Sequence, residues 1–162
     1  MAFRHLPDFC PEIAKEQTWC FTLPVDQNGL KAGDYVFLES YCDEAGCDCR
    51  RVWLTVLHRK PGAKTGDLIG PLATIGFGWE KPEFYKAWSP GDPDACKLAG
   101  ARLEPFQPQD AKADKVLAMT IGVILRPPAN VQRLKDHYAA VRKAVEGPDA
   151  GGGPGRGKLS VQ

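Results

Sequence analysis

The sequence predicts an α+β protein in which a small antiparallel sheet of about four strands is followed by two C-terminal helices. In the first half of the chain, β-branched and aromatic residues alternate in short runs bounded by glycine and proline. In the second half, apolar residues recur at helical spacings. The length of 162 residues, with 43% hydrophobic and 25% charged residues, suits a single globular domain, which we assign to residues 1–147.

Four segments are expected to be strands, after an irregular or partly helical lead-in over the first 17 residues. They are rich in Val, Ile, Thr and aromatic residues, and they cover residues 19–23, 34–42, 51–59 and 72–77. In the third strand the run Val-Trp-Leu-Thr-Val-Leu places apolar side chains on both alternating faces. We therefore expect helices to cover the outer side of the sheet as well.

Two helices are expected in the second half of the chain. The first can be capped by Asp110 and run to about Leu125, where Pro127-Pro128 stops it. The second can be capped by Asn130, because a clean apolar stripe follows it at Val131, Leu134, Tyr138, Val141 and Val145. Gly147 then ends this helix. The glycine-rich segment 148–162 is expected to be disordered, and the proline-rich residues 81–108 predict no clear element.

Composition narrows the classes of function. The formal net charge is +1, so no overall field draws the protein to nucleic acid or to an anionic membrane. No run reaches the length of a membrane span, and residues 1–16 lack the basic start and apolar stretch of a signal peptide. We therefore expect a cytoplasmic protein whose six cysteines are thiols or metal ligands rather than disulfides.

The most specific chemical feature is a cluster of three cysteines between the second and third predicted strands. Cys42, Cys47 and Cys49 have the spacing C-x4-C-x-C. Residues two apart in an extended segment point the same way, so Cys47 and Cys49 can present both sulfurs to one side. Gly46 allows the loop to fold back and bring Cys42 alongside. Three thiolates suit Zn²⁺, which binds sulfur at about 2.3 Å, and we predict a structural zinc site with these ligands.

The fourth ligand and two other interpretations stay open. His58 is excluded, because on a straight strand it would lie about 30 Å from Cys49. The remaining candidates are solvent, a substrate, Cys10, Cys20, Cys96 and His5. The three cysteines could instead be buried thiols that pack as small hydrophobic residues. Alternatively, Cys47 and Cys49 could form a redox-active dithiol.

Three other features are interpreted more simply. His137 lies beside the apolar stripe of the last helix and is interpreted as a helix-surface or boundary histidine, because no nucleophile or orienting carboxylate is evident. An aromatic group is interpreted as core or loop anchors, with a ligand-stacking surface as the alternative: Trp79, Tyr85 and Trp88. Basic residues at one end of the hairpin are interpreted as a solvated face, with nucleic-acid contact not favoured: Arg50, Arg51, Arg59, Lys60 and Lys64.

Four runs of the chain resemble an uncharacterised group of bacterial proteins. They are the YC-x4-CDCRRV run from Tyr41 to Val52, the ATIGFGW run that ends at Trp79, LEPFQPQ that ends at Gln109, and LKDHY that ends at Tyr138. The similarity spans roughly residues 35–142. Some members of that group carry a C-terminal zinc motif of the SecA-tail (SEC-C) type, which the printed sequence lacks. The resemblance implies zinc-associated chemistry and no particular reaction.

These observations favour a zinc-stabilised binding or adaptor protein with an unidentified protein partner, rather than an enzyme. One alternative is a metalloenzyme with an open fourth zinc position. A deaminase-type site is not expected, because it needs C-x-x-C and H-x-E spacings and neither occurs. The other alternative is a redox-active thiol protein.

Overall fold

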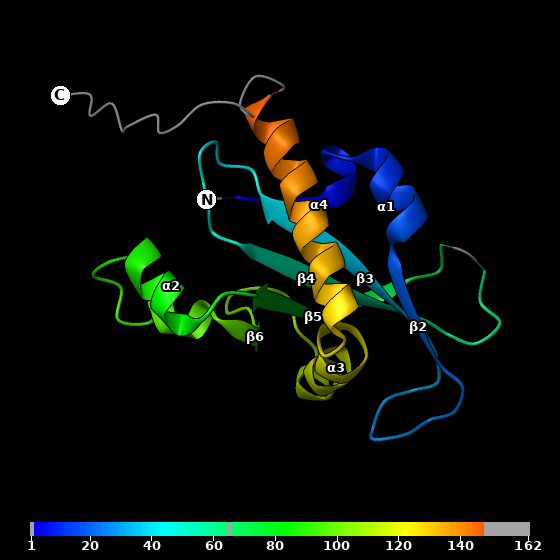
Figure 1. The fold of residues 1–162 in the computed structure, drawn as a ribbon. Coiled ribbons are helices and arrows are strands. Elements are labelled where there is room, and N and C mark those ends of the chain that lie inside the picture. Colours follow the sequence, from blue (N-terminus) through cyan, green and yellow to red (C-terminus); the bar gives the residue numbers. More distant parts are fainter. Residues whose placement is uncertain (1, 65, 148–162) are drawn as a thin grey trace.

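The computed structural model describes residues 2–64 and 66–147, which form an antiparallel sheet with helices against it (Figure 1). The strands lie in the order β1-β3-β4-β5-β6, and β2 pairs with the same edge of β3 as β1 does. Their bounds are β1 Phe3–His5, β2 Trp19–Leu23, β3 Gly33–Cys42, β4 Arg51–Arg59, β5 Ile69–Gly78 and β6 Gly100–Leu103. The α+β class is confirmed.

The sheet has six strands, so the predicted number of about four is wrong. The two additional strands, β1 and β6, are three and four residues long, and each pairs with one neighbour at an edge of the sheet. Such short segments carry too few residues to show an alternating pattern. The four predicted strands are all present, and β2 and β4 have the predicted bounds.

The described residues form four α-helices: α1 Pro11–Gln17, α2 Pro82–Trp88, α3 Ala113–Thr120 and α4 Pro128–Glu146. The α3 helix continues as one π-helical segment, Ile121–Leu125. Short 3₁₀ turns lie at Leu6–Asp8 and Ala95–Leu98. The α4 helix begins at Pro128, two residues before the predicted cap Asn130, because the fixed φ of proline suits the first helical turn.

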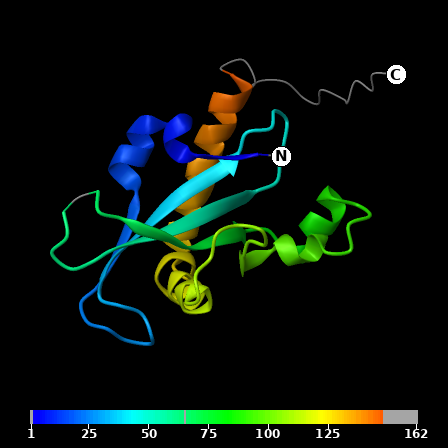
Figure 2. The same ribbon diagram turned by 180° about the vertical axis from the view of Figure 1, so that it is seen from behind.

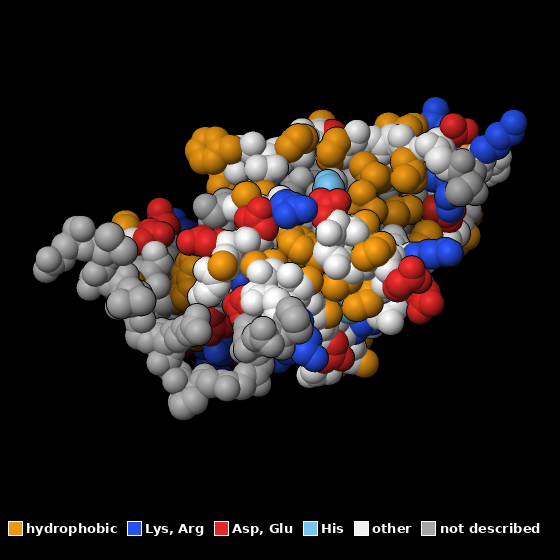
Figure 3. Space-filling view, turned by 90° about the horizontal axis from the view of Figure 1, so that it is seen from above, with side chains coloured by type: hydrophobic (Ala, Val, Ile, Leu, Met, Phe, Trp, Pro, Cys, Tyr) orange, Lys and Arg blue, Asp and Glu red, His pale blue; other side chains and the backbone are white. Residues whose placement is uncertain are grey.

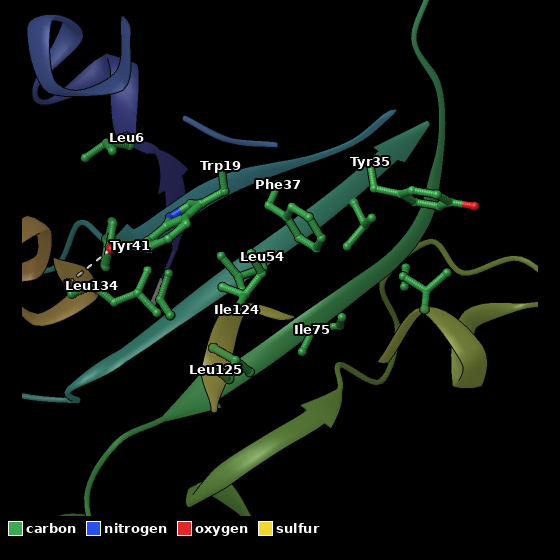
Figure 4. Packing of buried hydrophobic residues seen from close by; sticks show 14 of the residues in the cluster. Leu6, Trp19, Tyr35, Phe37, Tyr41, Leu54, Ile75, Ile124, Leu125 and Leu134 are labelled. Carbon is green, nitrogen blue, oxygen red and sulfur yellow. Dashed lines mark hydrogen bonds between the residues drawn. The ribbon is translucent and has the colours of Figure 1, made fainter. Parts of the chain in front are cut away.

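One face of the sheet carries the core (Figure 4). The inward side chains of the central strands are almost fully buried: Tyr35, Phe37 and Tyr41 of β3, and Val52, Leu54 and Val56 of β4. The α3 and α4 helices supply the facing layer, with Val116, Leu134 and Val141 fully buried. This alternation follows the period of two that the sequence shows for β4.

The opposite face of the central strands is not crossed by a helix of the described residues (Figures 1 and 2). Its side chains, which include Val36, Leu38, Trp53 and Leu57, are half-buried. The prediction that helices cover this side is therefore wrong, because α3 and α4 both pack on the core face. Hydrophobic side chains reach the molecular surface between charged ones, as the view from above shows (Figure 3).

The assignment of residues 1–147 to one domain stays a prediction. The segment 148–162, predicted to be disordered, lies outside the described residues. Within the described residues, no helix combines the length and the apolar character needed to cross a membrane.

Candidate metal centre

The loop between β3 and β4 brings the three predicted cysteines together. The sulfurs of Cys42, Cys47 and Cys49 all lie within 4.8 Å of one another. Cys42 and Cys49 are fully buried and Cys47 is half-buried. A tetrahedral Zn²⁺ with Zn–S distances of about 2.3 Å would hold its sulfurs about 3.8 Å apart, and the observed separations, all within 4.8 Å, are compatible with such a site. Three cysteines this close could hold a metal ion.

A tight turn, not an extended strand, produces this arrangement. The backbone N–H of Cys47 donates to the carbonyl of Glu44 at 3.2 Å, and Gly46 has a φ of 76°. A positive φ at the third residue is the signature of a type II turn, where glycine is favoured. Residues 43–50 belong to no strand, so the expectation that Cys47 and Cys49 lie on one face of a strand is wrong. Gly46 has the predicted role of folding the loop back.

The backbone of the loop is arranged around the sulfurs. The N–H of Glu44 donates to the sulfur of Cys42 at 3.4 Å. The backbone N–H groups of Cys49 and Arg51 lower the pKa of the Cys47 and Cys49 thiols, respectively. Hydrogen bonds of this kind favour the ionised thiolate, which is the form that binds metal.

Burial acts against ionisation. It is the largest influence on all three thiols and raises the pKa of Cys42, Cys47 and Cys49 above the ordinary value, although the backbone N–H groups partly offset this. Without a cation the three groups are therefore protonated near neutral pH. A bound divalent cation would displace these protons, because a coordinating thiol is deprotonated outright.

The α4 helix holds the loop through Arg142. Its Nη1 donates to the carbonyl of Glu44 at 2.9 Å and to that of Cys47 at 3.1 Å, and its Nη2 donates to the carbonyl of Cys42. One turn earlier, the Tyr138 hydroxyl accepts from the N–H of Arg50 at 3.3 Å. A single helix face thus fixes both sides of the cysteine loop.

The α2 helix holds the end of the loop through Arg50. Two nitrogens of this guanidinium contact Asp48 at 2.9 Å each, and a third contacts Glu80 at 3.2 Å. The hydroxyl of the buried Tyr85 donates to the Arg50 carbonyl at 2.9 Å. These contacts hold Arg50 at a φ of 47°, which is uncommon for a residue other than glycine. Tyr85 therefore acts as a loop anchor, one of the roles considered for the aromatic group.

The fourth-ligand candidates do not join the cluster. Within residues 2–64 and 66–147, the only group of three or more potential ligand atoms is that of the three cysteines. His5 instead contacts the Ser40 hydroxyl at 3.0 Å, and Cys20 lies on β2, where it pairs with Val36 of β3. His58 lies near the far end of β4, where its Nε2 contacts the Ala32 carbonyl at 2.9 Å. Its exclusion on grounds of distance is confirmed.

His137 is buried, so its interpretation as a helix-surface or boundary residue is wrong. Only 3% of the residue is exposed. Its Nδ1 lies 2.8 and 3.0 Å from the two carboxylate oxygens of Glu39, and its Nε2 lies 2.7 Å from Gln17 Oε1. The same Gln17 oxygen accepts from Arg133 at 3.2 Å, so His137 links Gln17 to Glu39 in a buried hydrogen-bond network. The sequence signal was Glu39, a charged residue at an inward position of β3.

The predicted basic face does not exist as one surface. Arg50 and Arg51 lie at the cysteine end of β4, whereas Arg59 lies at its other end. Each is paired with a carboxylate, and Arg51 is buried against Glu104 at 2.5 Å. The length of β4 therefore separates Arg50 and Arg51 from Arg59, so the three arginines do not form one basic surface.

No protein-family model, no curated protein and no solved structure matches this chain. The resemblance to an uncharacterised bacterial group stays a prediction.

Proposed function

We propose that this chain is a zinc-binding adaptor protein of the cytoplasm, in which Cys42, Cys47 and Cys49 hold a structural Zn²⁺ that orders the β3–β4 loop. The observation that carries the proposal is the approach of the three sulfurs to within 4.8 Å of one another, with the N–H of Glu44 donating to the sulfur of Cys42. An all-thiolate, tetrahedral site favours zinc over cations that prefer oxygen ligands.

The exposure of the loop supports a binding role. Glu44, Ala45, Gly46 and Asp48 are exposed, while the cysteines beneath them are buried or half-buried. A metal below the turn would fix the backbone of these residues and so present a rigid acidic edge to a protein partner. Preorganisation of this kind lowers the entropic cost of binding.

Metal analysis of the untagged full chain tests the proposal. Protein purified under reducing, chelator-free conditions should contain close to one zinc per chain, and the Cys47→Ser variant should lose it. Cys20→Ser is the matched control, because Cys20 is exposed on β2 and remote from the cluster, and it should keep the metal. Wild-type protein without metal, or Cys47→Ser with full zinc, would overturn the proposal.

The second candidate function is a metalloenzyme with an open zinc position. It is favoured by the observation that no fourth ligand joins the cysteines among the described residues. Catalytic zinc sites keep such a position for water or substrate. Substitution with Co²⁺ separates the two candidates, since only an open site would change its visible spectrum when azide or a small thiol is added. A redox-active thiol protein would instead contain no metal and would lose two free thiols reversibly under mild oxidant.

A further inference from the structure

An apolar cleft lies at the opposite end of the sheet from the cysteine loop. It has a volume of about 380 Å³ and lies between β2, the turn that follows β2, and the outer side of α3 with its π-helical extension. Its apolar lining includes Phe21, Leu23, Leu30, Met119 and Val123. This volume falls in the range of small-molecule sites, and the lining is of the kind that they use.

The cleft is remote from the candidate metal centre. Leu23 pairs with Gly33 at the start of β3, whereas Cys42 is the last residue of that strand. At about 3.3 Å per residue, the two positions are roughly 30 Å apart. Any ligand of the cleft therefore binds independently of the proposed zinc.

Gly122 keeps one wall of the cleft open. It lies in the π-helical segment and lines the cleft, and a side chain added there would meet nothing within 4 Å. Glycine is unfavourable in a helix by about 1 kcal/mol relative to alanine, so helix formation does not account for it. Single-turn π-helical segments occur frequently at functional sites because they reshape a helix surface locally.

The polar rim of the cleft is positively charged. Lys115 is the one charged residue among those that line it, and the others at the rim are the amides Gln27 and Asn28. Within the described residues, no carboxylate lies within 4.0 Å of the Lys115 ammonium. Lys31 and Lys112 line the adjoining hollow, where Asp26 is the only acidic residue and contacts Lys31 at 3.3 Å.

A turn holds this rim in place. Gln27 and Leu30 pair across it, and the residues between them, Asn28 and Gly29, have φ values of 53° and 76°. Two consecutive positive φ values define a type I′ turn, for which Asn-Gly is the preferred sequence. A side chain at Gly29 would collide with the Lys115 ammonium and the end of its stem, so this lysine lies directly against the turn.

We propose that this cleft binds a small amphiphilic monocarboxylate, such as a medium-chain fatty acid. The aliphatic body would lie against Phe21, Leu23 and Met119, where burial of apolar surface stabilises it. The carboxylate would meet Lys115, whose charge no group of the cleft neutralises. A cation would be repelled by this rim, and a neutral alcohol would lose the charge-assisted contact.

The proposal is tested by titrating the full chain with octanoate and following its ¹H–¹⁵N amide spectrum. Amides of residues 27–30 and 115–123 should shift. Octanol should bind at least tenfold more weakly than octanoate, as expected for loss of one charge-assisted hydrogen bond, and octylamine should not bind. Absence of shifts at millimolar octanoate, or equal binding of the three compounds, would overturn the proposal.

Two variants separate the charge from the cavity. Lys115→Met should weaken octanoate binding at least tenfold and leave octanol unchanged, because the apolar stem is kept. Gly122→Leu should abolish binding of both by filling the cleft; its φ is ordinary, so the helix should fold. Lys143→Met, an exposed change on α4, is the control and should bind like wild type. Unchanged octanoate affinity in Lys115→Met or in Gly122→Leu would contradict the proposed carboxylate site. Zinc content is measured on the same samples, so that a failure of this proposal can be told apart from a failure of the proposed zinc site.

Discussion

At the scale of single residues, the cysteine loop depends on groups that contain no sulfur. Arg142 alone donates to the carbonyls of three loop residues, Cys42, Glu44 and Cys47. Groups behind the ligands of a metal orient them, and their loss typically lowers metal affinity without removing the site. Arg142 is therefore a positioning residue for the proposed zinc.

Replacement of Arg142 by Met should weaken zinc binding by about 10–100-fold, the usual effect of losing a group behind the ligands. The methionine keeps the apolar stem but cannot hold the three carbonyls. Competition with a chromogenic chelator measures the change. Lys143→Met alters the neighbouring exposed position and should leave the affinity unchanged. Equal zinc affinities of Arg142→Met and Lys143→Met would show that the Arg142 contacts with the loop carbonyls do not position the cysteine ligands.

Gly76 is a second residue whose role depends on its surroundings. An added side chain would collide with Glu104 and with Arg51, which form a buried ion pair over this glycine. Gly76→Ala should therefore lower the free energy of unfolding by about 2–3 kcal/mol through overpacking, measured by urea denaturation. Gly122→Ala is the matched control, because its site is open, and it should be neutral or slightly stabilising. A neutral Gly76→Ala would mean that the ion pair moves aside at no cost.

At the scale of elements, α4 connects the core to the cysteine loop. His137 hydrogen-bonds to Glu39 in the middle of the helix, while Tyr138 and Arg142 contact the loop nearer its C-terminal end. Glu39 also accepts from Trp19 and from Tyr41, each at 3.2 Å. These contacts with β3 and with the cysteine loop fix how α4 packs on the sheet.

Removing one partner of the buried His137–Glu39 contact should be more harmful than removing both. His137→Leu leaves the buried Glu39 carboxyl group without this hydrogen-bond partner and should cost about 1–3 kcal/mol. The double variant with Glu39→Leu should recover a large part of this loss, because an apolar pair needs no compensation. Urea unfolding of the wild type, both single variants and the double variant measures the coupling. Strictly additive effects would contradict a direct pair.

At the scale of the whole molecule, the proposed zinc joins folding to metal binding. The cysteine loop connects the long strands β3 and β4 and is contacted by α2 and α4. An ordered loop therefore stabilises the packing of all four elements. Binding free energy at a structural metal site is folding free energy. Chelation should therefore lower the melting temperature of wild type and leave that of Cys47→Ser unchanged, which differential scanning fluorimetry can measure.

Zinc affinity should rise with pH. Burial raises the pKa of the three thiols, so they carry protons at neutral pH and must release them to bind metal. Below the thiol pKa the affinity should increase by up to about tenfold per thiol for each pH unit, or roughly a thousandfold for three. Titrations between weakly acidic and neutral pH measure this slope. A flat profile would mean that the thiols are already ionised.

The sequence by itself determined the features that depend on neighbours along the chain. The bounds of β2 and β4 follow from alternating residues, the last helix follows from its apolar stripe, and the approach of the three cysteines follows from a short spacing that contains Gly46. Each depends on only a few consecutive residues, because backbone periodicity and turn preference act locally.

Only the tertiary structure decided which distant groups meet. His137 meets Glu39 across 98 residues, and Arg142 reaches the Cys47 carbonyl across 95. Arg51 lies on Gly76 because strand register aligns β4, β5 and Glu104. The short edge strands β1 and β6, and the sheet face without a helix, were settled in the same way. These outcomes depend on strand register and on how the helices pack against the sheet. The folded arrangement keeps few unpaired charges buried and little apolar surface exposed. Because these terms involve the whole molecule, no single segment of the sequence shows them as a periodic pattern.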